Sequence, residues 1–445
     1  MKDTSLAPDS FPSHWERSTV GELYELSYGK GLVKKSRKED GPYPVYGSNG
    51  VVGHHENYVA EGPVVIVGRK GAAGEVHFSP ESCWPIDTTY FVKPKKAVDE
   101  KFTYYLLKSL RLKQFETSTA IPGLNRDDAY RLNIGVPPVQ EQKDIVAKIE
   151  TLFSELDKGI ESLKTARQQL KAYRQAVLKH AFEGKLTEQW RQQNADELEP
   201  PEQLLSRIPQ PDQPRGGRQA SVEVIGGVAA LAVNKPAKVP PGNWVWTPLL
   251  RVARQETGHT PSRKHPEYWD GDQYWIGIVD ARHNHGQVIQ ETAQKVTLEG
   301  LHNSSARTLP EGTVCLSRTA SVGYVCIMGK PMATSQDFAT WTCTEALEPK
   351  FLMYALMAEG NEIRRFGKGT THTTIYFPEI RALHICLPSV QEQKVIIEAV
   401  EAKLQQVSHA WNEIGSQLRK AETLRQSILK KAFSGQLVGD ALNAY

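Results

Sequence analysis

The sequence predicts an α+β protein in which two globular α/β domains are separated by two long helices, all arranged as an internal two-fold repeat. The repeat rests on two motifs that each occur twice. The copies open with PPVQEQKDIVAKIE at 137–150 and PSVQEQKVIIEAVE at 388–401, and they close with RQAVLKHAFEGKL at 174–186 and RQSILKKAFSGQL at 425–437. Every matched pair, such as Phe182 and Phe433, lies 251 positions apart, so neither copy contains an insertion. Loops tolerate insertions and long helices with fixed partners do not, so the repeated segments are predicted to be rigid helices.

The apolar residues of both repeated segments follow a heptad pattern, with steps that mostly alternate between three and four. The first segment has no proline between Pro138 and Pro200, and the second has none after Pro388. At ~1.5 Å per residue each helix is about 65 Å long, which is too long for one small domain to cover its apolar stripe. The expected seam residues are Ile145, Ile149, Leu152, Leu156, Ile160, Leu163, Ala166, Leu170, Tyr173 and Val177, then Ile397, Val400, Leu404, Val407, Trp411, Ile414, Leu418, Ala421 and Ile428.

We therefore expect the two helices to pair as a coiled coil. An antiparallel pair is favoured, because a chain that returns through a globular domain enters the second helix from the opposite end. The alternative is that each helix binds a separate protein.

Both helices are predicted to end at the motif Ala-Phe-x-Gly-x-Leu. Gly184 and Gly435 are expected to be C-terminal caps in the left-handed conformation, with the next leucine folded back. The Gln-Glu-Gln-Lys openings have two interpretations. A glutamate at a helix N-terminus complements the macrodipole, but the duplication equally indicates a shared surface for a partner. The partner-binding candidates are Gln140, Glu141, Lys143 and Arg174 in the first copy, and Gln391, Glu392, Lys394 and Arg425 in the second.

These motifs divide the chain into five parts. The first globular domain is expected at 1–137, the first long helix at 138–190, a linker at 191–243, the second globular domain at 244–388, and the second helix with the C-terminal tail at 389–445. The linker is rich in Pro, Gln, Gly, Ala and Val, so little regular structure is expected there. It is predicted to run as an extended strap, although its Ala/Val-rich part could pack on a neighbour.

The two globular domains share a framework and differ between its landmarks. Both open with a tryptophan, Trp15 and Trp244. Both continue with an apolar strand and a turn of small residues, VVIVGRKGAAG at 64–74 and VCLSRTASVG at 314–323. A shared scaffold with divergent loops is expected of two modules that recognise different targets.

The composition excludes several classes of protein. The chain has 445 residues and a formal net charge of only +3, so any contact with nucleic acid must depend on local basic clusters. No apolar run approaches the ~20 residues of a membrane span, and the N-terminus lacks the apolar core of a signal peptide. Five cysteines without a Cys-x-x-Cys motif argue against a disulfide framework or a zinc knuckle and favour the cytoplasm.

No catalytic motif is recognisable. The chain lacks the Gly-x-x-x-x-Gly-Lys-Ser/Thr phosphate loop and the His-Glu-x-x-His zinc motif. It also lacks the Asn-Pro-Pro-aromatic tetrad of an amino-methyltransferase and a nuclease-like carboxylate cluster. The segment GRKGAAG at 68–74 is predicted to be a tight turn rather than a nucleotide loop. We therefore expect a non-catalytic chain with no metal or cofactor of its own.

Basic residues gather in loops at matching places of the two domains. Lys and Arg supply phosphate contacts, and Arg, Asn, Gln and His can read base edges. The DNA-binding candidates are Lys30, Lys34, Lys35, Arg37, Arg69 and Lys70 in the first domain, and His259, Arg263, Lys264, Arg318, Lys368 and His372 in the second. A solvated surface explains any single cluster more simply, but the recurrence in both copies favours DNA.

The domain–helix–domain–helix order, the opening PPVQEQ at 137–142 and the closing RQAVLKHAFEGKLTEQW at 174–190 resemble the specificity subunit of a Type I restriction–modification system over nearly the whole chain. In that family each globular piece is a target recognition domain that reads one half of a bipartite site in double-stranded DNA. The paired helices set the spacing and bind two methyltransferase subunits, which methylate adenine, and restriction subunits complete the nuclease.

The resemblance also implies that S-adenosylmethionine, ATP and Mg belong to the partner subunits. It supplies no fixed set of base-contacting residues, so none is carried over by position. Two other functions are weighed against it: a stand-alone methyltransferase–nuclease, which the missing motifs disfavour, and a coiled-coil scaffold with no role on DNA, which a salt-dependent binding assay tests.

Overall fold

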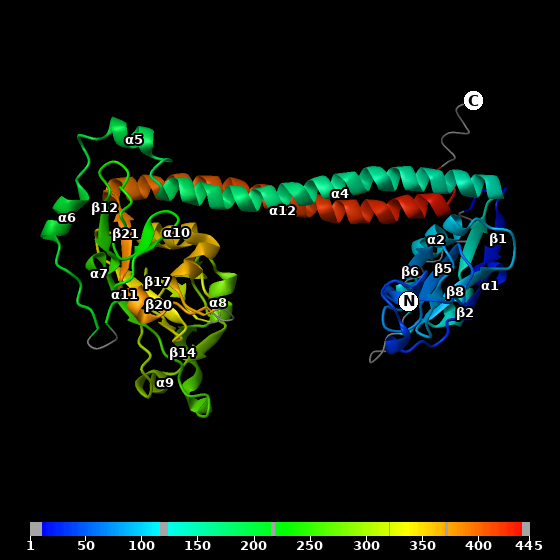
Figure 1. Cartoon of the computed structure of the whole chain (residues 1–445), viewed down its shortest axis with the longest axis horizontal. Coiled ribbons are helices and arrows are strands. Elements are labelled where there is room, and N and C mark those ends of the chain that lie inside the picture. The colour runs from blue at the N-terminus through cyan, green and yellow to red at the C-terminus, as the bar shows by residue number, and fades with distance from the viewer. Residues whose placement is uncertain (1–10, 116–122, 215–218, 320, 370–372, 438–445) are drawn as a thin grey trace. The chain divides into compact units, whose positions relative to one another are not determined.

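The chain folds into two compact units. Unit 1 comprises residues 1–166 and 413–445, and unit 2 comprises residues 167–412. The computed structural model describes residues 11–115, 123–214, 219–319, 321–369 and 373–437. The globular part of unit 1 is drawn in blue in Figure 1, and that of unit 2 in green to orange. Each unit therefore joins a globular domain to half of each long helix.

The two long helices are equal in length, as the constant offset of the repeat predicts, and both end within the predicted Ala-Phe-x-Gly-x-Leu motif, so the first ends before residue 190. Helix α4 (Val139–Phe182) and helix α12 (Val390–Phe433) each comprise 44 residues. In unit 1 the first half of α4 lies beside the second half of α12. The Arg425 guanidinium lies 4.6 Å from the centroid of the Phe153 ring and forms an ion pair with Asp157.

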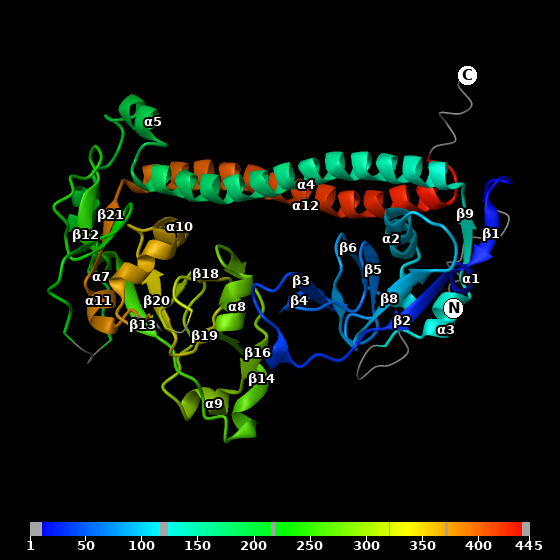
Figure 2. The same cartoon turned by 45° about the vertical axis from the view of Figure 1, so that its right-hand side comes forward.

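In unit 2 the opposite halves meet: the Arg167 guanidinium of α4 lies 4.1 Å from the Trp411 ring of α12. The helices therefore run in opposite directions, which confirms the predicted antiparallel pair (Figures 1 and 2). The predicted seam is wrong at Tyr173, which is 47% exposed, and it omits buried residues such as Val146, Phe153 and Leu178. Near the helix ends the globular domain adds contacts that a two-helix pattern does not contain.

The predicted C-terminal caps are confirmed. Gly184 and Gly435 have φ angles of +71° and +76°, a region that residues with a side chain rarely adopt. The N–H of the residue after each glycine donates to a carbonyl in the last helical turn, at 3.1 and 2.9 Å. Leu186 and Leu437 then pack, partly buried, against the cores of units 2 and 1.

Unit 1 contains a main sheet, a small sheet and a separate strand pair. Its strands are β1 (Glu16–Thr19), β2 (Tyr24–Tyr28), β3 (Tyr43–Gly47), β4 (Gly50–His55), β5 (Val64–Gly68), β6 (Val76–Ser79), β7 (Trp84–Pro85), β8 (Thr89–Pro94) and β9 (Asn133–Val136). Its short helices are α1 (Val20–Leu23), α2 (Glu100–Ser109) and α3 (Arg126–Tyr130). The main sheet has the order β2-β8-β5-β6, the small sheet β4-β3-β7, and β1 pairs with β9. Helix α2 covers the main sheet, because Phe102 and Leu106 share a core with Val65 and Val76.

Unit 2 repeats this plan with additions. Its strands are β10 (Ile225–Gly226), β11 (Leu231–Val233), β12 (Val245–Pro248), β13 (Ala253–Thr257), β14 (Trp269–Ile276), β15 (Val288–Ile289), β16 (Gln294–Val296), β17 (Val314–Ser317), β18 (Val325–Met328), β19 (Ala333–Thr334), β20 (Phe338–Cys343) and β21 (Leu383–Leu387). Its short helices are α5 (Glu188–Gln193), α6 (Pro201–Arg207), α7 (Leu249–Val252), α8 (Ile278–His283), α9 (Leu298–His302), α10 (Pro349–Glu359) and α11 (Phe377–Arg381). The sheets have the orders β13-β20-β17-β18-β15, β16-β14-β19 and β10-β11-β21-β12.

The internal repeat is therefore a repeat of sheets as well as helices. The order β2-β8-β5-β6 of unit 1 corresponds to β13-β20-β17-β18 of unit 2, and the pair β1-β9 corresponds to β12-β21. Helix α10 lies on the second main sheet as α2 lies on the first. This confirms the expected fold class, with α/β domains and two long paired helices.

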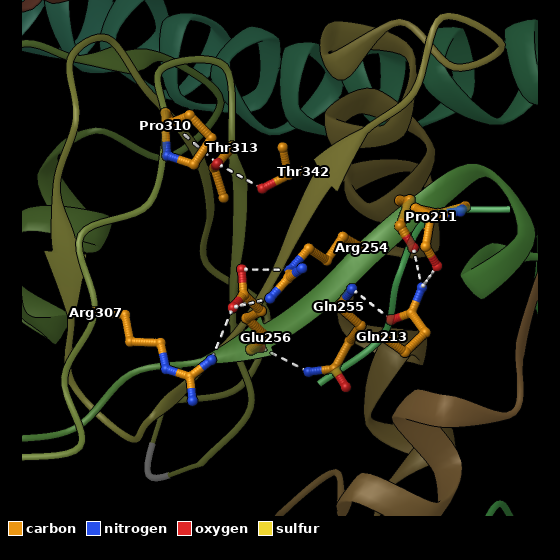
Figure 3. Close-up of polar contacts among 10 residues, drawn as sticks. Pro211, Gln213, Arg254, Gln255, Glu256, Arg307, Pro310, Thr313 and Thr342 are labelled. Atoms are coloured by element: carbon orange, nitrogen blue, oxygen red, sulfur yellow. Dashed lines mark hydrogen bonds and ion pairs between the residues drawn. The ribbon is translucent and has the colours of Figure 1, made fainter. Parts of the chain in front are cut away.

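The linker at 191–243 contains more regular structure than the sequence predicts. Residues 229–233 are buried, and β11 pairs with β21 in antiparallel register. Figure 3 shows a second attachment, in which the Gln213 side chain accepts the Gln255 N–H at 3.0 Å. The same side chain donates to the Ala253 carbonyl at 3.0 Å. The Ala/Val-rich part therefore packs on unit 2, as the sequence allowed. For this part, the prediction of an extended strap with little regular structure is wrong. The pairing strand lies about 150 residues away, so local composition does not reveal it.

Candidate nucleic-acid interface

Arg69 follows β5, a central strand of unit 1, and hydrogen bonds hold it in a fixed position. Its backbone N–H donates to the Thr88 carbonyl at 2.8 Å, and its carbonyl accepts the Leu124 N–H at 2.9 Å. The guanidinium donates to the Asp87 carbonyl at 2.9 Å. These bonds orient the side chain at the end of the strand.

Arg318 follows β17 and makes the same three hydrogen bonds in unit 2. Its N–H donates to the Asp337 carbonyl at 2.8 Å, its carbonyl accepts the Ile375 N–H at 2.9 Å, and its guanidinium donates to the Gln336 carbonyl at 2.9 Å. Burial lowers the pKa of Arg318, but arginine starts so far above neutrality that it stays charged. The repeat therefore extends to the geometry of one arginine side chain in each unit.

Aromatic and cationic side chains meet at the edge of the unit 1 sheet where β2 and β5 end and β8 begins. Antiparallel pairing places these ends together, with Tyr28 opposite Tyr90 and their rings 5.1 Å apart. The Arg69 guanidinium lies 4.9 Å from the Tyr28 ring, and that of Arg126, the first residue of α3, lies 5.3 Å from it. Lys70 is exposed next to Arg69. A solvent-facing aromatic ring with two guanidiniums can stack on and hydrogen-bond to bases.

The corresponding edge of unit 2 brings together three predicted residues. Arg318 lies 4.3 Å from the ring of Phe377, the first residue of α11. His259 is exposed just after β13, and Lys368 forms a 3.4 Å ion pair with Glu379 of α11. His372 lies outside the described residues. Arg318 and His259 therefore face the same end of the sheet as Arg69 does in unit 1.

The other candidates of unit 1 lie on the loop between β2 and β3. Lys34 and Lys35 are exposed on a single 3₁₀ turn. Lys30 lies 5.7 Å from the Trp84 ring. Arg37 is half-buried and donates to a backbone carbonyl of its own loop at 3.2 Å. Lys34 and Lys35 are thus the better placed of these residues for contact with a phosphate.

In unit 2 the loop after β13 carries Arg263 and Lys264, both exposed. The Arg263 guanidinium lies 4.1 Å from the Trp269 ring. By contrast, the carboxylate of Glu256 on β13 pairs with two arginines, Arg254 of the same strand at 3.3 Å and Arg307 of the loop before β17 at 3.5 Å (Figure 3). Such internal pairing leaves less charge for an external anion.

The Gln-Glu-Gln opening of α4 joins the helix to unit 1. The Glu141 carboxylate accepts the indole N–H of Trp15 at 3.0 Å and contacts His14 at 2.9 Å. Gln142 donates to the Pro137 carbonyl at 2.8 Å and accepts the Asp99 N–H at 2.9 Å. The motif that begins the helix and the tryptophan near the start of the domain are separate in the sequence, and they meet in one contact.

The opening of α12 makes the corresponding contact in unit 2. Glu392 accepts the indole N–H of Trp244 at 3.0 Å, the Thr187 hydroxyl at 2.7 Å and the Arg191 guanidinium at 2.9 Å. Its side chain has no exposed surface. The expectation that Glu392 contacts a partner subunit is therefore corrected: its carboxylate is fully used inside unit 2.

The remaining partner-binding candidates are placed on the helix surface. Gln140, Lys143, Gln391, Lys394 and Arg174 are exposed, and Arg425 is half-buried in its ion pair across the two helices. Contact with a partner stays a prediction for these residues.

Sequence reasoning missed Tyr28 and Arg126. Neither lies in a run of basic residues. Both come close to Arg69 only through tertiary contacts, namely strand pairing and the hydrogen bond between the Leu124 N–H and the Arg69 carbonyl. One signal was available: Arg126 and Phe377 are 251 positions apart, as are the helix motifs. That matching identifies an arginine in one copy where the other has a phenylalanine.

The described residues contain no group of His, Cys, Asp or Glu arranged to hold a metal ion. No helix in the described part of the chain is long and apolar enough to cross a membrane. The segment at 68–74 is the turn between β5 and β6, as predicted, with the Gly74 N–H donating to the Gly68 carbonyl at 2.8 Å.

Comparisons with known proteins agree on one family. The family model for the Type I restriction modification DNA specificity domain matches twice, at residues 12–165 and 241–409. The EcoDI specificity subunit of a Type I restriction enzyme from Escherichia coli is 23% identical, over 97% of this chain and 90% of its own length. The EcoKI specificity subunit from Escherichia coli K12 is 22% identical, over 84% of this chain and 74% of its own length.

Solved structures show the same fold. A chain from a study of complex assembly and conformational transition of the type I R-M system matches with a TM-score of 0.65 and 17% identity, covering 96% of this chain and 99% of its own. The HsdS subunit from Thermoanaerobacter tengcongensis matches with a TM-score of 0.53 and 16% identity, covering 96% and 98%.

Proposed function

Because this chain belongs to the Type I restriction modification DNA specificity family, we propose that it selects the DNA target of a Type I complex by reading the two halves of a bipartite site, one with each globular domain. The observation that carries this proposal is the arginine that follows the central strand of each main sheet. Arg69 and Arg318 have the same hydrogen bonds but different neighbours. A constant anchor with variable surroundings suits two readers of different sequences.

The chemistry of the sheet edges supports direct contact with bases. An arginine that bonds two acceptors of guanine at once discriminates by ~1–3 kcal/mol. Stacking on an aromatic ring limits the rotation of the guanidinium, so less entropy is lost when it binds. The exposed lysines at Lys34 and Lys35 would neutralise phosphates and position the domain without reading sequence.

The long helices have a different task in this proposal. They set the length of the spacer between the half-sites and dock two methyltransferase subunits, which methylate adenine. The exposed residues Gln140, Lys143, Gln391 and Lys394 are available for that docking. Glu141 and Glu392 instead fix the angle at which each helix leaves its domain, through their bonds to tryptophan.

We further propose that the chain is non-catalytic and acts in the cytoplasm. S-adenosylmethionine, ATP and Mg would be held by the methyltransferase and restriction subunits. The observation in favour is the sequence, which contains none of the motifs for these groups.

The experiment is to express the full chain with its methyltransferase subunits and map methylated adenines across a genome. We expect one bipartite motif with a constant spacer, and no methylation by the purified chain alone. Replacing residues 1–137 with the matching domain of a relative should change one half of the motif. A continuous motif, a change in both halves, or methylation by the isolated chain would refute the proposal.

A further inference from the structure

We propose that Arg126 is a second base-reading arginine of unit 1, and that the position shared by Arg126 and Phe377 determines part of the difference between the two half-sites. This inference rests on the proposed function and deepens it. It names a specificity-determining position that neither the family match nor the basic clusters of the sequence identify.

The Arg126 side chain is oriented by two aromatic rings. Its guanidinium lies 5.3 Å from the Tyr28 centroid and 5.6 Å from that of Tyr130. The Tyr130 hydroxyl accepts the Leu26 N–H of β2 at 2.8 Å, so this ring is fixed to the main sheet. The arginine is therefore held at the sheet edge by stacking.

The hydrogen-bond donors of Arg126 are not satisfied within the described residues. No hydrogen bond or ion pair is found for its guanidinium there, and its Nε atom is buried without a partner. A structural arginine normally has its donors paired. A guanidinium that is stacked and unpaired presents its outer edge to a ligand.

Two guanidiniums share the Tyr28 ring, since Arg69 lies 4.9 Å from it. The ring itself is 53% exposed. Like charges near one ring repel each other, so the arrangement becomes favourable when an anionic or acceptor-rich ligand binds to both. The major-groove edge of guanine, with its O6 and N7 acceptors beside the phosphate backbone, is such a ligand.

Unit 2 replaces this second arginine with an apolar contact. Phe377 begins α11 as Arg126 begins α3, and Arg318 stacks on it at 4.3 Å. The strand positions of Tyr28 and Tyr90 are taken by Thr257 and Ala339, which also face each other. The aromatic partner has thus moved from the strand to the helix, and one charge is lost.

This exchange predicts different chemistry for the two half-sites. Unit 1, with two guanidiniums, should select guanine at one more position than unit 2 does at the matching place. Phe377 would contact the thymine methyl group, which apolar side chains recognise. The position therefore acts as a switch between guanine and thymine.

The test uses the full chain in complex with its methyltransferase subunits and a library of randomised duplexes. The variants are Arg126→Phe, Arg126→Lys and the reciprocal Phe377→Arg. We expect Arg126→Phe to lose about ten-fold preference for guanine at one position of the unit 1 half-site. The unit 2 half-site should be unchanged, and Phe377→Arg should strengthen guanine there.

Arg126→Lys separates base reading from phosphate contact. It should lose the base preference but keep the salt dependence of binding, because the charge remains while the planar fork is lost. Unfolding temperatures of all variants, measured alongside, identify a structural effect.

The outcomes distinguish this inference from the proposed function. Unchanged base preferences in Arg126→Phe, while Arg69→Gln alters them, would overturn the role of Arg126 and leave the proposed function standing. A lower unfolding temperature with unchanged preferences would do the same. A wild-type complex that selects no bipartite site would instead refute the proposed function.

Discussion

The two units have the same framework, and they differ at the side chains that lie on its edge. Both have the same order of main-sheet strands, the same tryptophan–glutamate contact and the same arginine after the central strand. They differ in what surrounds that arginine: Tyr28 with Arg126 in one, Phe377 in the other. The constant contacts have both partners inside the fold, whereas the variable side chains need only fit a ligand.

A second difference concerns the surface of α2 and α10 next to the long helices. In unit 1 an open groove of about 640 Å³ lies there, lined in part by Tyr104, Tyr105 and Phe153. In unit 2 the loop after α8 covers α10, and a side chain on Gly286 would lie 2.6 Å from Met357. The extra elements of unit 2 therefore fill a surface that unit 1 leaves open.

The largest expected effect comes from lengthening both long helices together. Inserting four residues near Leu163, with a matching insertion near Ile414, lengthens each by ~6 Å and keeps the helical phase to within ~40°. If the helices set the spacer, the preferred spacing grows by one or two base pairs at ~3.4 Å each. Methylation mapping measures this. An unchanged spacing in a folded variant would show that another element sets the distance.

The tryptophan–glutamate contacts allow a direct comparison of the units. Glu392→Ala removes one partner of a buried ion pair, so we expect unit 2 to lose about 3–5 kcal/mol of stability. Glu141, whose side chain is 19% exposed, has no arginine partner among the residues that the structure describes, and Glu141→Ala should cost unit 1 about 1–2 kcal/mol.

Hydrogen exchange measured separately on peptides of each unit gives both values, since two units need not unfold together. Equal losses in the two units would contradict the comparison.

The two helix caps should lose similar amounts of stability when their glycines are replaced. Gly184→Ala and Gly435→Ala place a methyl group 2.7 Å from Pro241 and 2.2 Å from Pro12, at φ angles above +70°. We expect a loss of about 1–2 kcal/mol in each unit, because both strain and clash are introduced. Gly159→Ala is the matched control: nothing lies within 4 Å of its added methyl group, so it should stabilise unit 1 by ~0.5–1 kcal/mol. The same hydrogen-exchange measurement applies, and tolerance of alanine at either cap would contradict the prediction.

The smallest effect concerns the lysine loop of unit 1. Lys34→Ala with Lys35→Ala should reduce the slope of log affinity against log salt by up to ~2 and leave base preference intact, since phosphates carry no sequence. Binding titrations at several salt concentrations measure this. Lys164→Ala, which removes an exposed lysine of α4 paired with Glu161, is the control. A changed base preference would contradict the prediction that these lysines contact only phosphates. An effect equal to that of the control would indicate that they belong to a solvated surface without contact to DNA.

The sequence by itself determined the repeat, both ends of the long helices and the turn at 68–74. Helix bounds follow from local rules: Pro138 precedes the first turn, the heptad pattern continues unbroken, and Gly184 adopts the conformation that ends it. Arg69 and Arg318 were also selected from the sequence, because strand and turn are short and recur.

Only the tertiary structure decided how distant segments meet. It showed that Glu392 is buried against Trp244, that β11 pairs with β21, and that Arg126 stacks on Tyr28. In each case the partners are about 100 residues or more apart in the chain, so no local periodicity records their contact. Local patterns encode hydrogen bonds within one helix or turn, whereas the pairing of strands and the packing of side chains depend on which surfaces the whole fold brings together.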